Sequence, residues 1–288
     1  MGRKTQSVEE KLLLENKVYL EVLTGLEVLE SFIDNFLGMP MITIECAEIW
    51  GGINSANEDI QTKGVSASLS SQAHLGEKGG DIYYFSVCGK GLITRIAIAD
   101  VTGHGEIASQ ISEWIYKGLL EHMNMTDGSE VLKRVNEIAF AEGARGITTA
   151  SVFTINQIDS TLSFSIAGHP PFFFKKREEN DWKEIALKKQ IPKGNIPLGI
   201  FENAPYHEET IQIKNGDRFF VYTDGLIEAT NKNLEQFGRN SLLNILNSNS
   251  KKKLKELKHS IDSAVKNHLK EVHIQDDLTL MAMEVAVN

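Results

Sequence analysis

The sequence is poor in the features that mark several large classes of protein. It contains only two cysteines, Cys46 and Cys88, and neither lies in a CxxC motif or a Cys/His cluster, so neither a zinc site nor a disulfide-rich mini-protein is expected. No apolar run approaches the roughly 18 residues of a membrane span. The first residues, MGRKTQSVEEK, lack the apolar core of a secretion signal. Two thiols without an export signal predict reduced cysteines in a cytoplasmic protein.

Positive charge is also in short supply. The chain has 30 Lys and Arg residues against 39 Asp and Glu residues, which gives a net charge of -9 at pH 7. Such a chain has no electrostatic reason to bind nucleic acid or an anionic membrane, so neither is predicted as a partner. What is present is ordinary globular composition, with 41% hydrophobic and 24% charged residues in 288, enough to bury a sizeable core.

The N-terminal region has the pattern of an amphipathic helix, from about Gln6 to Leu37. Positions at alternating spacings of three and four share one stripe, in which Glu15 is the only polar residue. The apolar positions are Leu12, Tyr19, Val22, Leu26, Leu29, Ile33 and Phe36. The stripe is compatible with a homodimer formed through this helix or with burial against the chain's own body. Because Pro40 ends the helix, we predict a helix and linker over residues 1–40 and one domain over 41–288.

Beyond Pro40 the pattern changes to strands with two helix pairs. A strand around Met41–Ile49 precedes a loop over Gly51–Gly64. Further strands are predicted at 65–70, 81–88, 94–99, 148–155, 162–167, 172–175, 182–185, 209–213, 218–222 and 278–285. Helices are predicted at 106–123, at 129–142 with Ser129 as N-cap, at 234–246 and at 252–270. We interpret Lys175–Lys183 as a solvated loop or hairpin. Strands grouped in this way, without βαβ alternation, predict an α+β domain of antiparallel sheets with helices on the outer faces.

Acidic residues mark four places where a strand meets a turn. They are Asp81 after two glycines, Asp100 after the apolar run Ala97–Ala99, Asp224 before Gly225, and the pair Asp276-Asp277. Any one of them alone is best explained as a turn residue. If the four converge, however, two bare carboxylates about 5 Å apart repel by roughly 3 kcal/mol at an effective dielectric near 20. Either the pKa values rise or cations neutralise the cluster, and oxygen ligands favour Mg²⁺ or Mn²⁺ over zinc.

Six motifs occur in a set order along the chain: GGD (79–81), DVTGHG (100–105), AGHPP (167–171), IPLG (196–199), YTDG (222–225) and DDLTL (276–280). On these motifs the sequence resembles the metal-dependent protein phosphatase (PPM) family, in its bacterial SpoIIE/RsbU-like branch. The resemblance covers about Ile42 to Val285. It implies an α-β-β-α sandwich of two antiparallel sheets flanked by helix pairs.

The resemblance also implies a site and a reaction. Asp100 would bridge two divalent cations, Mn or Mg, with Asp81 and the backbone carbonyl of Val101 on one cation and Asp224 and Asp276 on the other. Asp277 is the less favoured residue of its pair. A water activated by the two metals would hydrolyse a phosphoserine or phosphothreonine monoester. The substrate would be a phosphorylated regulatory protein, resembling an anti-sigma-factor antagonist, in bacterial partner-switching signalling.

Two histidines and two arginines near these motifs have weaker support. His104 is a hypothetical general acid, although it lies two positions beyond the histidine of animal members, where this chain has Thr102. A turn role for His104 and a structural role for His169 are the plainer interpretations. Arg95 and Arg145 are candidates for binding phosphate, without support from their positions.

Two other functions remain open at this stage. A catalytically silent PPM-fold signalling or scaffold module would keep the fold and bind partners, although all four aspartates are present. A nucleotide phosphohydrolase has less support, because the sequence contains no GxxxxGK[ST] loop.

Overall fold

The computed structural model describes residues 46–74, 78–103, 105–188 and 196–286. The chain divides into two compact units, Met1–Ile44 and Glu45–Asn288, and the described residues all belong to the second. The predicted N-terminal helix, its homodimer and His104 lie outside the described residues. Within the described ranges, no helix combines the length and apolarity needed to cross a bilayer.

Two six-stranded sheets form the centre of the second unit. The strands of sheet A, in spatial order, are β1 (Cys46–Asn54), β4 (Lys78–Cys88), β5 (Ile93–Val101), β6 (Thr148–Asn156), β7 (Thr161–Ala167) and β10 (Glu208–Gln212). Those of sheet B are β2 (Ala56–Gln61), β3 (Val65–Gln72), β12 (Leu278–Val285), β11 (Arg218–Tyr222), β8 (Phe172–Lys175) and β9 (Lys183–Ile185). Each pairing between neighbouring strands is antiparallel.

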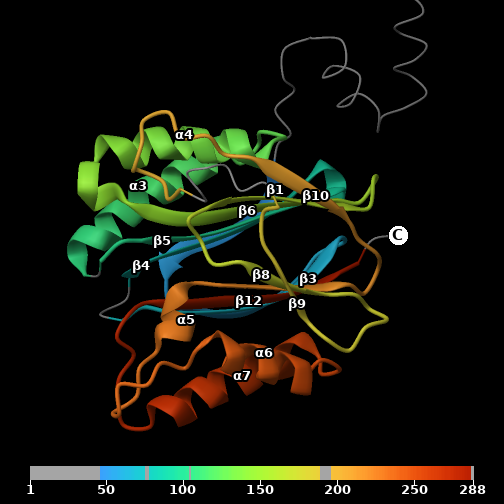
Figure 1. The fold of residues 1–288 in the computed structure, drawn as a ribbon. Helices are drawn as coiled ribbons and strands as arrows, with labels where there is room; N and C mark the ends of the chain where they lie inside the picture. The colour runs from blue at the N-terminus through green and yellow to red at the C-terminus, as the bar shows by residue number, and fades with distance from the viewer. Residues whose placement is uncertain (1–45, 75–77, 104, 189–195, 287–288) are drawn as a thin grey trace, which may run out of the picture. The chain divides into compact units, whose positions relative to one another are not determined.

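Helices cover the outer face of each sheet, so the unit has four layers (Figure 1). The pair α3 (Glu106–His122) and α4 (Gly128–Ala141) packs on sheet A, and the pair α6 (Arg239–Ser248) and α7 (Leu254–Leu269) packs on sheet B. The short helix α5 (Asp224–Glu228) follows β11 directly. The predicted α+β sandwich is confirmed.

The layers explain why the central strands are apolar along their whole length. In β4, alternate side chains point to opposite faces of the sheet. Tyr83 and Phe85 enter the core between the sheets, whereas Ile82 and Tyr84 enter the core beneath α3 and α4. Every residue of β4 after Lys78 is therefore buried, and the aspartate within the strand, Asp81, is buried with them.

Several local predictions need correction. The expected loop over Gly51–Gly64 instead contains the end of β1 and all of β2. The N-cap of α4 is Asp127, whose carboxylate accepts the Ser129 N–H at 2.7 Å, and not Ser129 itself. Helix α6 begins at Arg239 and not at residue 234, since Leu234 has a positive φ of 62° and is exposed in a turn.

The state of the cysteines also differs from the expectation. Cys88 is disulfide-bonded, although reduced thiols were predicted. The register of β1 and β4 sets the backbone of Cys46, the other cysteine, directly opposite Cys88. Directly opposed residues of antiparallel strands have Cα atoms about 4.5–5.5 Å apart, which suits a disulfide. The sequence spacing gives no sign of this pairing, because it depends on the strand register.

Candidate metal centre

Two of the predicted aspartates face each other across neighbouring strands. Asp81 on β4 and Asp100 on β5 are directly opposed in the antiparallel register. Glycine at position 80 allows the adjoining backbone to come close, since a Cβ there would lie only 2.9 Å from the carbonyl oxygen of Val101. Sheet A thus brings Asp81, Asp100 and the Val101 carbonyl to one place.

Sheet B supplies the other two aspartates. Asp224 begins α5 immediately after β11, and Asp276 lies just before β12, the strand paired with β11. A Cβ at Gly225 would lie 2.0 Å from the carbonyl oxygen of Asp277, so only glycine permits this approach of the two segments. Close packing of these two segments therefore explains why the YTDG motif ends in glycine.

A hydrogen bond between the sheets joins the two halves of the site. Thr223, at the N-cap of α5, donates its Oγ1 hydrogen to Asp81 Oδ2 at 2.8 Å. The backbone N–H of Thr279 donates in turn to Thr223 Oγ1 at 2.9 Å. Thr223 belongs to the YTDG motif, but its role could not be predicted because a bond between two sheets leaves no trace in local spacing.

The electrostatics show that the carboxylates share one environment. Burial, followed by the charges of Asp277 and Asp276, raises the pKa of Asp81 well above its ordinary value. Burial, followed by the charges of Asp81, Asp224 and Asp276, raises the pKa of Asp100 well above its ordinary value. In the part of the chain that the structure describes, neither Asp81 nor Asp100 forms an ion pair with a lysine, arginine or histidine.

The aspartate oxygens are of the chemical type that binds a divalent cation, but the side chains are not arranged as a complete binding site. Asp81 Oδ1 is buried and has no hydrogen-bond partner, which is costly for an oxygen unless a ligand meets it. Hard oxygen donors of this kind suit Mg²⁺ or Mn²⁺. Among the described residues, however, no three Asp, Glu, His or Cys side chains are placed so that they would hold one ion as they stand. Binding would require these side chains to draw together.

Asp277 has a different environment from its neighbour Asp276. Its side chain is buried, and its Oδ1 accepts the His74 N–H at 2.6 Å while its Oδ2 accepts the Gly80 N–H. Both oxygens are thus committed to the backbone, on the segment that carries Asp81. These two bonds give Asp277 a positioning role that the sequence did not predict.

His169, one of the remaining candidates, and Glu228 both lie near the aspartates. His169 is buried, with Nδ1 2.8 Å from the Thr149 Oγ1, and Thr149 is directly opposite Asp100 in the β5–β6 register. Burial lowers the pKa of His169 to about 3, so the ring is neutral. Glu228, which sequence analysis missed, also lies near the site, since burial and then Asp224 and Asp276 raise its pKa.

The two arginine candidates differ from each other. Arg95 is only 1% exposed, sits five positions before Asp100 on β5 and donates to the Met125 carbonyl, so its candidacy as a phosphate ligand is wrong. Arg145 is exposed in the turn before β6 and pairs with Glu142 at 3.6 Å. That turn adjoins the site's rim, since Thr102 donates its backbone N–H to the Ile147 carbonyl.

Solved structures share this fold. The PP2C phosphatase domain of SpoIIE from Bacillus subtilis, with a fragment of its regulatory domain, matches with a TM-score of 0.63 at 20% identity, over 90% of this chain and 75% of that one. RsbX in complex with magnesium matches with a TM-score of 0.59 at 18% identity, over 80% of this chain and 100% of that one. At these identities the likeness establishes the fold alone.

Sequence comparison identifies relatives and a family. Phosphoserine phosphatase RsbP of Bacillus subtilis (strain 168) is 24% identical over 190 residues, covering 63% of this chain and 43% of RsbP. The chain spans less than half the length of the curated relatives it matches. The profile of the family described as stage II sporulation protein E (SpoIIE) matches residues 92–286, from the start of β5 through β12, and thus includes Asp100, Asp224 and Asp276. Since this match covers well over half of the sequence, the chain belongs to the SpoIIE family.

Proposed function

We propose that the chain is a metal-dependent protein phosphatase that hydrolyses phosphoserine or phosphothreonine monoesters. The observation that carries the proposal is the mutual electrostatic influence of Asp81, Asp100, Asp224 and Asp276, of which Asp81 is buried, Asp100 and Asp224 are half-buried and Asp276 is exposed. Neither Asp81 nor Asp100 has a cationic partner among the described residues. Such a cluster is stable with its charge intact only if cations neutralise it. A purely structural role gives no reason for carboxylates from separate segments to act on one another's charge in this way.

The protein groups would divide between two cations. Asp81, Asp100 and the Val101 carbonyl would hold one, and Asp100, Asp224 and Asp276 the other. When bound, divalent cations make a water molecule nucleophilic near neutral pH and neutralise charge on the phosphoryl oxygens. The chain's own contribution is to fix the donors: Thr223 orients Asp81, Asp277 anchors the Gly80 backbone, and Gly225 lets α5 approach the Asp276 loop.

The substrate class follows from the family. RsbP is described as a phosphoserine phosphatase, and another matching structure contains the RsbU and RsbW domains of Rv1364c from Mycobacterium tuberculosis. We propose a phosphorylated regulatory protein in partner-switching signalling as the substrate, acted on in the cytoplasm. His104 as general acid and a homodimer through residues 1–40 remain predictions.

Hydrolysis of an aryl phosphate with added Mn²⁺ tests the activity. We expect the wild-type protein to hydrolyse the aryl phosphate. In Asp100→Asn, kcat/KM should fall at least a hundredfold. Asp181→Asn, a substitution of the same type at an exposed residue on the β8–β9 connection, is the matched control and should keep wild-type activity. Equal rates for wild type and Asp100→Asn would favour the silent scaffold module instead.

A phosphoserine protein compared with a phosphotyrosine peptide tests the substrate class. We expect hydrolysis of the first and little of the second. Preferential release of phosphate from the tyrosine ester would contradict the proposed specificity without contradicting the metal site.

A further inference from the structure

A polar hollow lies at the end of sheet B away from the aspartates. Asp224 follows the last residue of β11 and Asp276 precedes the first residue of β12, whereas Arg218 begins β11 and pairs with Glu284 near the end of β12. The hollow at that end has a volume of about 470 Å³, and Arg218 and Glu284 line it together with Lys175, Arg177, Glu179 and Lys251. It is a separate feature from the candidate metal centre.

The charge of this hollow is opposite to that of the chain. Four cationic side chains line it against two carboxylates, in a protein of net charge -9. Both carboxylates already have cationic partners, because Glu284 pairs with Arg218 at 2.6 Å and Glu179 pairs with Lys183 at 2.6 Å. The positive charge of the hollow is therefore incompletely neutralised by the protein.

Lys175 is the buried lysine of the hollow. The residue is 6% exposed, and its Nζ donates to the carbonyl oxygens of Lys176 at 3.2 Å and Glu179 at 3.0 Å. In the described residues no carboxylate forms an ion pair with it. Asp217, Glu284 and Glu179 act on its charge from a distance without forming an ion pair, and the ammonium has a third N–H to donate.

The other buried lysine in the described residues shows the contrast. Lys258 is 4% exposed, donates to Asn57 Oδ1 at 2.6 Å and to the Leu69 carbonyl at 3.1 Å, and also has Asp59 at 3.6 Å. Its charge is balanced inside the protein. Lys175 donates to two backbone carbonyls, has no carboxylate at ion-pair distance among the described residues, and lines an open hollow.

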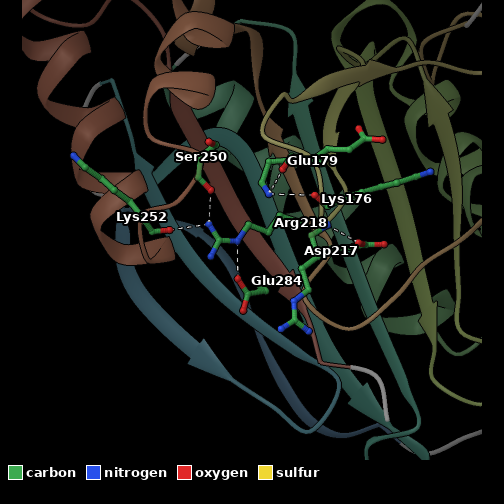
Figure 2. Close-up of polar contacts among 9 residues, drawn as sticks. Lys176, Glu179, Asp217, Arg218, Ser250, Lys252 and Glu284 are labelled. Atoms are coloured by element: carbon green, nitrogen blue, oxygen red, sulfur yellow. Dashed lines mark hydrogen bonds and ion pairs between the residues drawn. The ribbon is translucent and has the colours of Figure 1, made fainter.

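A rigid frame presents two further cations to the hollow. Arg218 Nη1 donates to the carbonyl oxygens of Ser250 at 3.1 Å and Lys252 at 2.7 Å, so it fixes the backbone on both sides of Lys251 (Figure 2). The backbone N–H of Arg177 donates to Asp217 Oδ1 at 2.8 Å, and the stem of Arg177 packs against Gly216, where a Cβ would lie 2.8 Å from its Cδ. Neither Arg177 nor Lys251 has an ion-pair partner within the described ranges.

We propose that this hollow is a binding site for a phosphate-bearing anion. Arg and Lys together are the usual ligands of phosphate oxygens, and the Lys175 ammonium supplies the buried charge that a doubly charged group would neutralise. A volume of about 470 Å³ suits a ligand larger than a bare ion, such as a pyrophosphate or a phosphorylated side chain. The phosphate could come from a small molecule or from a phosphoprotein segment, and both offer the same chemistry.

Calorimetric titration of the metal-free protein in EDTA tests the site, because the uncompensated aspartates then repel anions from the other centre. The probes are inorganic phosphate, pyrophosphate and a phosphoserine peptide. We expect one equivalent of pyrophosphate or of the peptide to bind, with weaker affinity at higher KCl. The probe that binds more tightly identifies the source of the phosphate. No binding by any probe at millimolar concentration would overturn the proposal.

Variants locate the binding. Arg177→Gln/Lys251→Gln should weaken it at least tenfold, and Lys175→Met, which keeps the apolar stem, should do the same. Lys117→Gln/Lys232→Gln removes the same charge from exposed positions elsewhere and should leave the affinity within twofold of wild type. Equal weakening in both double variants would show a general charge effect and contradict a site. Hydrolysis of aryl phosphate should be unchanged in Arg177→Gln/Lys251→Gln, so failure here is distinguishable from failure of the phosphatase proposal.

Discussion

At the scale of single residues, Asp277 holds the backbone that carries Asp81. Its two carboxylate oxygens accept the N–H groups of His74 and Gly80, and an asparagine can accept only one of them. We predict that Asp277→Asn lowers the free energy of unfolding by about 1–3 kcal/mol, the cost of one unsatisfied buried N–H group. Urea denaturation of wild type and variant measures this.

The same substitution should also weaken metal binding, because it loosens the backbone that carries Asp81. We expect Asp277→Asn to need a higher Mn²⁺ concentration for half-maximal hydrolysis, since the Gly80-Asp81 backbone is less well held. Asp159→Asn, in the exposed β6–β7 turn, is a control of the same chemistry and should leave the Mn²⁺ requirement unaltered. An unchanged Mn²⁺ requirement in Asp277→Asn would show that Asp277 has no positioning role.

The burial of His169 predicts that the free energy of unfolding depends on pH. Burial holds its folded-state pKa at about 3, below the ordinary value of 6.5, so below pH 6.5 the unfolded chain binds a proton that the folded chain does not. Its contribution to stability is complete above pH 6.5 and is lost as pH falls toward 3, at about 1.4 kcal/mol per pH unit. Between pH 6.5 and 5 the expected loss is about 2 kcal/mol.

A variant isolates this contribution. Asp81 and Asp100 have raised pKa values, so in metal-free protein their contribution changes in the opposite sense and is lost as pH rises. The difference between wild type and His169→Gln, measured by urea denaturation in EDTA at each pH, cancels the aspartates to first order. That difference should shrink as pH falls from 7 to 5. A difference independent of pH would mean that His169 titrates normally in the folded protein.

At the scale of elements, the approach of α5 to the loop before β12 brings Asp224 and Asp276 together. Gly225→Ala places a Cβ 2.0 Å from the Asp277 carbonyl oxygen, so the two segments must move apart. We predict at least a tenfold loss of kcat/KM for aryl phosphate. In Gly52→Ala the nearest atom to the new Cβ is Tyr83 Oη at 3.5 Å, an ordinary contact, so this control should remain active.

Gly225→Ala should keep its overall fold, because α5 is a short element at the edge of the sandwich. Its far-UV circular dichroism should therefore match wild type while its Mn²⁺ affinity falls. Full activity in Gly225→Ala would mean that the spacing of α5 and the Asp276 loop does not matter to the site.

Elements with a clear period could be predicted, and elements fixed by tertiary contacts could not. Strands β8, β11 and β12 have the residues that their apolar runs predict, because each run fills a core on both faces. The region Lys175–Lys183 has loop-like composition, yet Lys175 and Trp182 are 6% and 3% exposed. The region is a hairpin, one of the two predicted alternatives, because β8 and β9 pair at the edge of sheet B. Local pattern does not show that its ends are buried, and so the anion hollow was also missed.

At the scale of the whole molecule, the proposed metal site takes its aspartates from distant segments in both stacked sheets. Asp100, Asp224 and Asp276 lie at or just beyond strand ends, as their local sequence predicts, whereas Asp81 lies inside β4, which begins at Lys78 and not at Asp81. That two of them belong to sheet A and two to sheet B follows from the strand order, which local sequence does not give. The resemblance to a known family predicted their convergence, whereas the inter-sheet bond of Thr223 and the disulfide at Cys88 needed the three-dimensional register.

The most direct measurement is calorimetric titration of the metal-free protein with Mn²⁺, run on wild type, Asp100→Asn and Asp181→Asn. Wild type and Asp181→Asn should each bind two cations with a rise in melting temperature, because the ions neutralise carboxylates that otherwise repel one another. Asp100→Asn should lose the residue shared by both ions and bind at least tenfold more weakly. Identical titrations for wild type and Asp100→Asn would contradict a metal centre built on these aspartates.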